Sequence, residues 1–256
     1  MAERDQIYVL LDRLMVPEGA EAVEKWLQGL ASRLSPQIVS FINAHAVNLT
    51  MKDTLFSDAL LTSDHLLRDG SGMKMMLKLL GRPPGENLNG TDLIPRIIDA
   101  FVDKFGEMDR KPRVAIIGTQ SPWVDEAAIA IQKKGCEVKL VMDGFQSEDA
   151  YMRALSTPPV DLIVLGMGMP RQEKLAVSLK TSLKYPVTIL NGGAILDFLG
   201  GKVERAPLIV RKAGMEWLWR LGKEPKRLFG RYVVGNAVFI FRALCLKLGA
   251  KPQDVD

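Results

Sequence analysis

The chain has 256 residues, 47% of them hydrophobic and 25% charged, which is the composition of a folded globular protein. This composition excludes a disordered chain and a fibrous repeat. A disulfide scaffold is excluded as well, because only two residues are cysteines. Cys136 and Cys245 fit a reducing compartment, and the sequence leaves open whether they form a disulfide.

The net charge of +4 is unevenly distributed along the chain. Residues 201–256 contain 12 Lys or Arg against 5 Asp or Glu, whereas residues 1–200 contain 22 against 25. A basic segment that follows an acidic one indicates an anionic partner for the basic segment. A solvated basic face without a partner is the alternative.

The first 19 residues place acids and Arg4 before a short apolar run that Asp12 and Arg13 interrupt, a pattern unlike a signal peptide. No run of about 18 uncharged apolar residues occurs in the chain. We therefore expect a cytoplasmic protein without a transmembrane helix.

Short apolar runs alternate with helix-length amphipathic stretches through the first 200 residues. Helix-sized spacers between buried strands are typical of βαβ units, so the sequence predicts an α/β fold with a Rossmann-like parallel sheet. The expected strands are Ile38–Asn43, Ala59–Thr62, Val114–Gly118, Glu137–Met142, Asp161–Gly166 and Val187–Asn191.

Helical patterns occupy Pro122–Lys134 and Gln172–Leu183, between expected strands. Arg110–Pro112 has the character of a connection between two lobes of the α/β body. We expect these lobes to span about residues 1–110 and 111–200.

Residues 201–256 show helical patterns only and form the expected C-terminal appendage. Gly222 can end one helix, and Pro225 suits the first turn of the next. Val233–Leu248 is strongly apolar, but an asparagine and two basic residues interrupt it. This pattern favours an amphipathic helix that lies on a membrane surface, and a helix packed on the protein core is the alternative.

Three expected strands end in turns that carry glycine, and parallel strands bring these turns to one edge of the sheet. Ligands of doubly wound sheets bind at that edge, and backbone N–H groups at helix starts favour phosphate. The chain lacks a full G-x-G-x-x-G pattern, so a dinucleotide site is not supported. The residues expected at a nucleotide site are Gly118, Thr119, Gly166, Gly168, Arg171, Gln172, Glu173, Asn191 and Gly192.

Asp69 follows a short apolar stretch and precedes a helix expected to start near Met73. An aspartate held at such a turn could act as a general base toward a hydroxyl group. Asp-Gly is also a common turn and Asp a common helix cap, and composition alone favours that interpretation.

The two histidines, His45 and His65, do not have the spacing of metal ligands, and Cys/His clusters are missing from the sequence. The one D-x-D pattern is Asp254–Asp256, at the C-terminus. We therefore expect no metal cofactor.

Several motifs occur in a fixed order: Asn43-Ala44-His45-Ala46, Arg68-Asp69-Gly70-Ser71-Gly72, Gly90-Thr91-Asp92-Leu93, Gly166 to Lys174, Arg205-Ala206-Pro207, Gly214 to Leu221, Glu224 to Leu228 and Arg231-Tyr232. Each motif alone is weak, but the ordered set is specific. From about Ile38 to Tyr232 the chain resembles the WecG/TagA/CpsF glycosyltransferase family.

This resemblance implies an inverting glycosyltransferase that needs no metal. Such an enzyme moves a sugar from a UDP-sugar to a polyprenyl-diphosphate-linked saccharide during synthesis of bacterial surface polysaccharide or exopolysaccharide. It further implies a Rossmann-like body whose C-terminal appendage docks on the inner face of the plasma membrane. No nucleic acid partner is expected, and a homo-oligomer stays open.

The resemblance also assigns roles to residues. Asp69 matches the general base, Asn43 a position near the acceptor, and Gln172 a position near the nucleotide-sugar. Arginine suits a diphosphate because its guanidinium is a charged, bidentate donor. The appendage arginines that match positions near the diphosphate are Arg220, Arg227 and Arg231.

The chain departs from the family pattern at Phe41, where a threonine is usual, and at Asn87, where an arginine is usual. We expect both residues in the pocket region. The stretches around Asn43 and Asp69 are similar to the xanthan-type branch, which implies transfer of glucose. The alternatives are transfer of N-acetylmannosamine or its uronic acid, and a membrane-surface binding module without catalysis.

Overall fold

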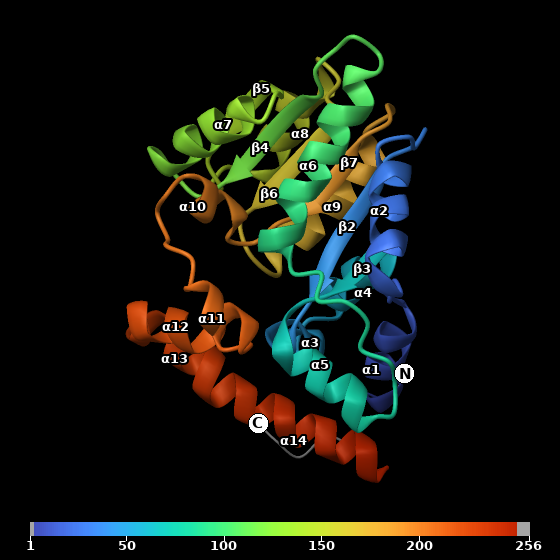
Figure 1. Ribbon diagram of the computed structural model, residues 1–256, viewed down its shortest axis with the longest axis vertical. Coiled ribbons are helices and arrows are strands. Elements are labelled where there is room, and N and C mark those ends of the chain that lie inside the picture. Colours follow the sequence, from blue (N-terminus) through green and yellow to red (C-terminus); the bar gives the residue numbers. More distant parts are fainter. Residues whose placement is uncertain (1–2, 250–256) are drawn as a thin grey trace.

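The structure is a computed structural model that describes residues 3–249 (Figure 1). Seven strands form one sheet in the order β1-β3-β2-β7-β6-β4-β5, and each neighbouring pair is parallel. The strands are β1 (Leu14–Met15), β2 (Gln37–Ile42), β3 (His65–Arg68), β4 (Arg113–Gly118), β5 (Glu137–Met142), β6 (Leu162–Gly166) and β7 (Thr188–Asn191). The predicted α/β fold with a parallel sheet is confirmed.

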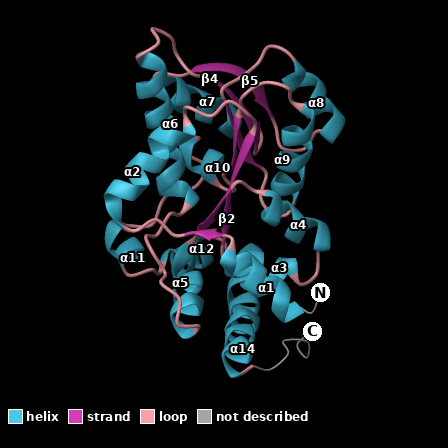
Figure 2. Cartoon of the chain, turned by 90° about the vertical axis from the view of Figure 1, so that its right-hand side faces the viewer, coloured by secondary structure: helices cyan, strands magenta, loops and turns pink. Residues whose placement is uncertain are grey.

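Helices cover both faces of this sheet (Figure 2). One face carries α2 (Gly19–Leu30), α6 (Gly90–Gly106), α7 (Trp123–Lys133) and α10 (Ile195–Leu199). The other carries α8 (Glu148–Ser156) and α9 (Arg171–Ser182). Val114 and Ile116 pack on the first face, and Ala115 and Ile117 on the second. Burial on both faces explains why this strand is a continuous apolar run.

The remaining helices of the body gather near β2 and β3. They are α1 (Glu3–Asp12), α3 (Ala44–Thr50), α4 (Thr54–Thr62) and α5 (Gly70–Leu79). Their buried side chains form a core of their own with Ile42 and Leu66.

The carboxyl ends of all seven strands lie along one edge, because every strand is parallel. The chain leaves β4 for β5 on one side and returns to β6 on the other, which makes a topological switch point at β4 and β6. There Gly118 has φ +155°, and a Cβ atom on it would come within 2.5 Å of the Gly166 backbone. Only glycine fits this contact.

The expected strand Ala59–Thr62 is wrong, because these residues belong to α4 and the strand is β3. Asp53 caps α4 by accepting a hydrogen bond from the backbone N–H of Phe56 at 2.9 Å. Phe56 and Leu60, four residues apart, are buried on one face of this helix. Three apolar residues followed by a threonine are too short a stretch to reveal that period.

Three smaller expectations also differ from the structure. The short edge strand β1 was not expected. The helix expected near Met73 begins at Gly70, and Gly222 lies inside α12 rather than at its end. Helix boundaries depend on the last hydrogen bonds, which sequence constrains only to within a few residues.

The appendage consists of α11 (Leu208–Lys212), α12 (Glu216–Lys223), α13 (Pro225–Phe229), a π-helical turn (Gly230–Val234) and α14 (Gly235–Leu248). α14 packs along α3 and α5 (Figure 1). Its Phe239, Ala243 and Leu246 are buried with the core of the body. Arg242 is buried as well, and its Nη1 donates to Asn48 Oδ1 at 2.7 Å.

The opposite face of α14 is exposed and apolar, with Ile240, Phe241, Leu244 and Leu248 at the surface. The helical stretch Pro225–Leu248 is long and apolar enough, by length and composition alone, to cross a membrane. Its buried face shows that it also packs on the protein. The alternative interpretation of this segment, packing on the protein core, therefore holds for one face of α14, and contact of its exposed face with a membrane stays a prediction.

Candidate active site

A cavity of about 490 Å³ opens at the carboxyl ends of β2 and β3, between the body and the appendage. The body contributes Asn43, His45, Asp69 and Asn87 to its lining. The appendage contributes Arg211, Glu216, Trp217, Arg220, Arg231 and Tyr232.

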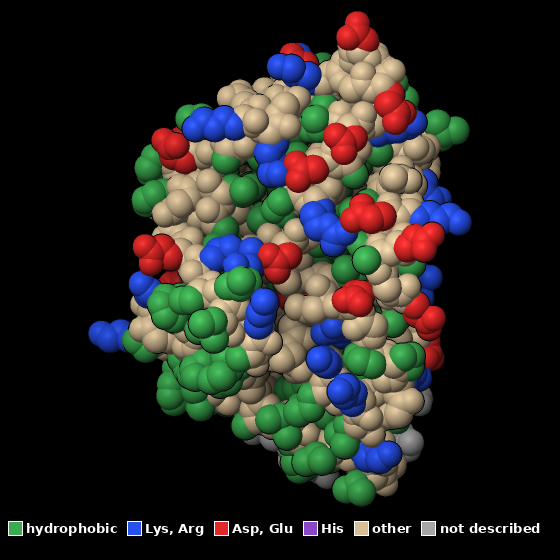
Figure 3. Space-filling view, viewed as in Figure 1, with side chains coloured by type: hydrophobic (Ala, Val, Ile, Leu, Met, Phe, Trp, Pro, Cys, Tyr) green, Lys and Arg blue, Asp and Glu red, His purple; other side chains and the backbone are tan. Residues whose placement is uncertain are grey.

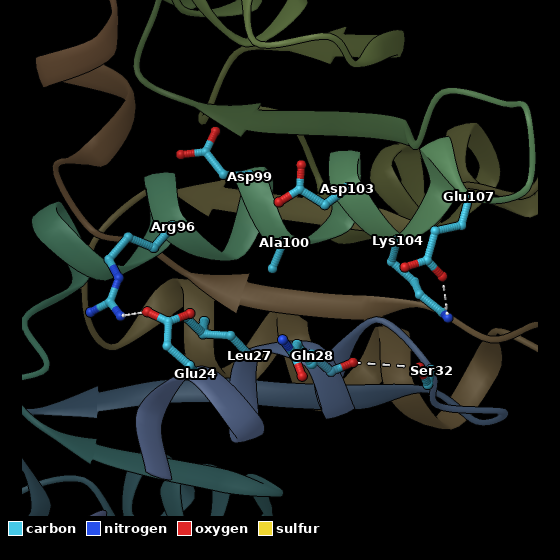
Figure 4. A pocket seen from close by; sticks show the side chains of 10 residues that line it. All are labelled: Glu24, Leu27, Gln28, Ser32, Arg96, Asp99, Ala100, Asp103, Lys104 and Glu107. Carbon is cyan, nitrogen blue, oxygen red and sulfur yellow. Dashed lines mark hydrogen bonds and ion pairs between the residues drawn. The ribbon is translucent and has the colours of Figure 1, made fainter. Parts of the chain in front are cut away.

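A second cavity of about 500 Å³ lies between α2 and α6 on one face of the sheet (Figure 4). Four of its charged side chains pair with one another, Arg96 with Glu24 and Lys104 with Glu107. It is also remote from the strand ends where ligands of this fold bind. The candidate site is therefore the cavity between body and appendage.

Asp69 lies at the N-cap position of α5, but its carboxylate does not cap the helix. Instead Asp69 Oδ2 accepts a hydrogen bond from Asn43 Nδ2 at 3.2 Å. Asn43 is itself held in place, because its Oδ1 caps α3 by accepting from the backbone N–H of Ala46 at 3.0 Å. The capping interpretation of Asp69 is wrong, and its carboxylate is directed into the cavity beside Asn43.

Burial raises the pKa of the Asp69 carboxyl group. The Asn43 hydrogen bond and then the charges of Arg231, Arg220 and Arg68 act in the opposite direction. A desolvated carboxylate is a stronger base than an exposed one, and the nearby positive charges favour its ionised form. The environment thus suits Asp69 to accept a proton.

The turn under Asp69 is fixed by a buried arginine. Arg68 Nη1 donates to Asn87 Oδ1 at 3.2 Å and to the carbonyl of Gly70 at 3.0 Å. Asn87 Oδ1 also accepts from the backbone N–H of Gly70 at 3.2 Å. Asn87 therefore both lines the cavity and holds the turn that carries Asp69.

The expectation that Phe41 lies in the pocket region is wrong. Its side chain is only 3% exposed and packs in the core on the α6 side of the sheet. The ring lies 3.3 Å from the position that a Cβ atom on Gly90 would occupy. Phe41 lies within β2 with its side chain on the α6 side of the sheet, whereas Asn43 follows the end of the strand and caps α3, where it reaches the cavity.

The three predicted arginines occupy two kinds of position. Arg220 and Arg231 line the cavity, and the buried Nε atom of each lacks a hydrogen-bond partner within the described residues. Burial lowers the pKa of Arg231. Arg227 is exposed outside the cavity, and its Nη2 donates to Glu224 Oε1 at 2.7 Å. Two of the three are thus free to bind an anion in the cavity.

Gln172 lies beneath two glycine turns at the strand ends. Its Oε1 accepts from the backbone N–H groups of Gly168 and Gly193, both at 3.0 Å. Its Nε2 donates to Glu173 Oε1 at 2.8 Å, and both side chains are 1% exposed. Burial raises the pKa of Glu173 to about 7. The Gln172 side chain therefore connects the turn after β6 with the turn after β7 through hydrogen bonds to a backbone N–H group in each.

Thr119 follows β4 with a positive φ of 43°. Its Oγ1 donates to Asp197 Oδ1 at 2.6 Å and accepts from Lys202 Nζ at 3.1 Å. Arg171 donates to the carbonyls of Gly144 and Gln146, both at 2.6 Å, and so anchors the loop after β5.

The turn after β7 is equally tight. Asn191 is buried and donates through Nδ2 to Ser40 Oγ at 2.8 Å. A Cβ atom on Gly192 would come within 2.3 Å of Ile195. Together with Gly118 and Gly166, these turns form a glycine-bearing rim next to the Asp69 cavity.

His45 is a cavity residue that the sequence did not single out as part of the site. Burial, followed by the charge of Arg231, lowers the pKa of His45 to about 4, so its imidazole is neutral near pH 7. Its place two residues after Asn43, in the first turn of α3, was the available signal. Within residues 3–249 no group of three or more His, Cys, Asp or Glu could hold a metal ion, and Asp254–Asp256 lies outside these residues.

The sequence profile described as "Glycosyl transferase WecG/TagA/CpsF family" matches residues 7–253. Three similar proteins are named N-acetylglucosaminyldiphosphoundecaprenol N-acetyl-beta-D-mannosaminyltransferase. The Bacillus spizizenii protein is 29% identical over 182 residues, 69% of this chain and 67% of the relative. The Bacillus subtilis protein is 24% identical over 193 residues (74% and 73%), and one from Staphylococcus aureus 23% over 197 (76% and 72%). Since the profile spans nearly the whole chain, the protein belongs to the WecG/TagA/CpsF glycosyltransferase family.

Proposed function

We propose that this protein transfers a hexosyl group from a UDP-sugar to a polyprenyl-diphosphate-linked saccharide, with inversion at the anomeric carbon. The observation that carries the proposal is Asp69, held by Asn43 in a cavity that Arg220 and Arg231 also line. A base, an orienting amide and two guanidinium groups are what an acceptor hydroxyl attached to a diphosphate requires.

In the proposed reaction, the acceptor hydroxyl loses its proton to Asp69 as its oxygen attacks the anomeric carbon of the donor. The bond from that carbon to the UDP oxygen breaks, and UDP leaves with the electron pair. We place the donor diphosphate at the edge formed by the carboxyl ends of β4, β6 and β7, where ligands of doubly wound sheets bind. Positive charge comes from the protein, and we propose that no metal ion takes part.

The names of the relatives support N-acetylmannosamine as the donor sugar and a lipid-linked N-acetylglucosamine as the acceptor better than they support glucose. One argument for glucose has also weakened, because Phe41 lies in the core and does not contact the cavity. Asn87 does line the cavity and remains the residue through which the sugar preference could differ.

We further propose that the appendage docks on the inner face of the plasma membrane. Figure 3 shows hydrophobic side chains gathered over the lower part of the molecule, where the appendage lies, with Lys and Arg among them. The exposed apolar residues of the appendage include Ile209, Leu218, Phe229, Val234, Phe241 and Leu244. An apolar surface with basic neighbours suits an interface of anionic lipids, where the acceptor resides.

The test is a panel of donors, UDP-N-acetylmannosamine, its uronic acid and UDP-glucose, assayed with short polyprenyl diphosphates that carry N-acetylglucosamine or glucose. The proposal expects UDP release and a lipid product with one added sugar, fastest for N-acetylmannosamine on N-acetylglucosamine. Absence of transfer from all donors, with intact binding to lipid vesicles, would instead favour a membrane-surface binding module without catalysis.

A further inference from the structure

The part of the appendage that covers the cavity is not held to the body by apolar packing. No residue of α11 or α12 is buried, and Leu228 is the buried residue of α13. In α14, by contrast, Phe239, Ala243 and Leu246 are inside the core of the body. Hydrophobic stabilisation follows buried apolar area, so α11 and α12 depend on polar contacts to stay over the cavity.

The main polar contact is made at Asp92, in the first turn of α6. Asp92 Oδ1 accepts a hydrogen bond from Arg205 Nη1 and lies 3.5 Å from Arg211 Nη1. Asp92 Oδ2 accepts from Asn89 Nδ2 at 2.8 Å. The cap of α6 is Asn89, whose Oδ1 accepts from the backbone N–H of Asp92. The Asp92 carboxylate is therefore available to the two arginines of the appendage.

These contacts lead to the cavity. Arg211 is one of its lining residues, whereas Asp92 and Arg205 are not. The guanidinium carbons of Arg205 and Arg220 lie 5.9 and 5.4 Å from the centre of the Phe198 ring. Arg205 and Arg220 thus lie against the same aromatic ring, which connects the ion pair at Asp92 with a residue that lines the cavity.

A second polar contact supports the same arrangement from the side of Asp69. Ser71 Oγ, in the first turn of α5, donates to the carbonyl of Gly214 at 3.0 Å. Gly214 has φ +72°, which lets the chain reverse between α11 and α12. The segment is therefore attached to the body at two separate polar points, Asp92 and Ser71.

We propose that Asp92 is a positioning residue: through Arg205 and Arg211 it holds α11 and α12 closed over the cavity and places Arg220 toward the diphosphate of the acceptor. The assignment to the acceptor rests on the proposed function. It gives a role to the Gly-Thr-Asp and Arg-Ala-Pro motifs, which the resemblance left without one. The two motifs meet at an ion pair between residues 113 positions apart.

The first test is amide hydrogen exchange on the full-length protein without substrates. Asp92→Asn should speed exchange in residues 208–223 and leave residues 239–246 unchanged, because α14 keeps its apolar packing. Arg205→Gln removes the same ion pair from the other side and should act alike, and the double variant should exchange no faster than either single one. Asp103→Asn is the control, since Asp103 is an exposed carboxylate of the same helix.

The second test is steady-state kinetics with the lipid-linked acceptor. Asp92→Asn and Arg205→Gln should each raise the KM for the acceptor about fivefold, the scale of a partly exposed ion pair, and leave the KM for the UDP-sugar unchanged. Equal rises in both KM values would mean general loosening and overturn the assignment. The assignment would also be overturned if Asp92→Asn showed the same amide exchange rates and the same KM values as the control Asp103→Asn. Because the exchange test needs no substrate, an inactive wild-type protein would refute the proposed function and leave the ion-pair contact testable.

Discussion

Replacing Gln172 by leucine tests whether the turns after β6 and β7 depend on the side-chain amide of Gln172. The change removes the acceptor of two backbone N–H groups, those of Gly168 and Gly193, and the donor to Glu173 Oε1. An unpaired buried backbone donor costs about 1–3 kcal/mol, and water can reach these half-buried glycines in part. We expect Gln172→Leu to lower the free energy of unfolding by about 2–4 kcal/mol.

The same change should weaken donor binding more than acceptor binding, because the turns it connects belong to the glycine-bearing rim where we propose that the donor binds. Urea unfolding followed by circular dichroism gives the stability, and calorimetric titration with UDP gives the affinity. Gln132→Leu is the control, since Gln132 is exposed on α7 and should shift stability by less than about 0.5 kcal/mol. If Gln172→Leu were as stable as Gln132→Leu and bound UDP equally well, the connecting role would be refuted.

Three further predictions concern other parts of the molecule. Phe239→Ala should lower the free energy of unfolding by about 3–5 kcal/mol, because the Phe239 ring is buried against Gly72. Thermal unfolding measures this change, and a value below about 1 kcal/mol would show that α14 is not docked on the body. The pKa of His45 is about 4 in the folded protein against an ordinary value of 6.5, so the unfolded chain binds a proton at a higher pH than the folded protein does. The free energy of unfolding should therefore fall as the pH drops from about 6.5 toward 4. His45→Phe should flatten that dependence in urea titrations, and an unaltered slope would contradict it. Binding to anionic vesicles, measured by flotation, should weaken at high salt, because added salt shortens the Debye length below its physiological value of about 8 Å. The Leu244→Glu variant should also bind more weakly, because it places a charge on the exposed apolar face of α14. Binding that does not depend on salt would argue against docking through the basic residues of the appendage.

Strands β2, β4, β6 and β7 could be predicted from sequence because they are buried on both faces. Val114–Gly118 stands out as an apolar run, and its register with β6 follows from the glycines at the two strand ends. The α4 helix was misread for the opposite reason: its last residues are apolar as a block, and the cap at Asp53 lies outside that block. The hydrophobic pattern of a sequence predicts long buried helices and strands, but it does not tell a short helix from a short strand.

The sequence singled out several residues that line the cavity, but it did not show how their side chains contact one another. Asp69 and Asn43 were placed together by the ordered motifs, and the structure shows the hydrogen bond between them. The sequence could not show that Arg227 pairs with Glu224 outside the cavity or that Gln172 lies beneath the turns, because both depend on rotamers set by tertiary packing. The contact of Asp92 with Arg205 joins distant segments and leaves no local pattern.

The most direct test of the account is turnover by Asp69→Asn at saturating donor and acceptor. Asparagine keeps the size of the side chain and removes its capacity to take a proton. The account predicts a fall in kcat of about 10²–10⁴-fold with UDP affinity unchanged, because general-base catalysis contributes on that scale. A kcat within threefold of the wild-type value would contradict the role of Asp69 and with it the proposed mechanism.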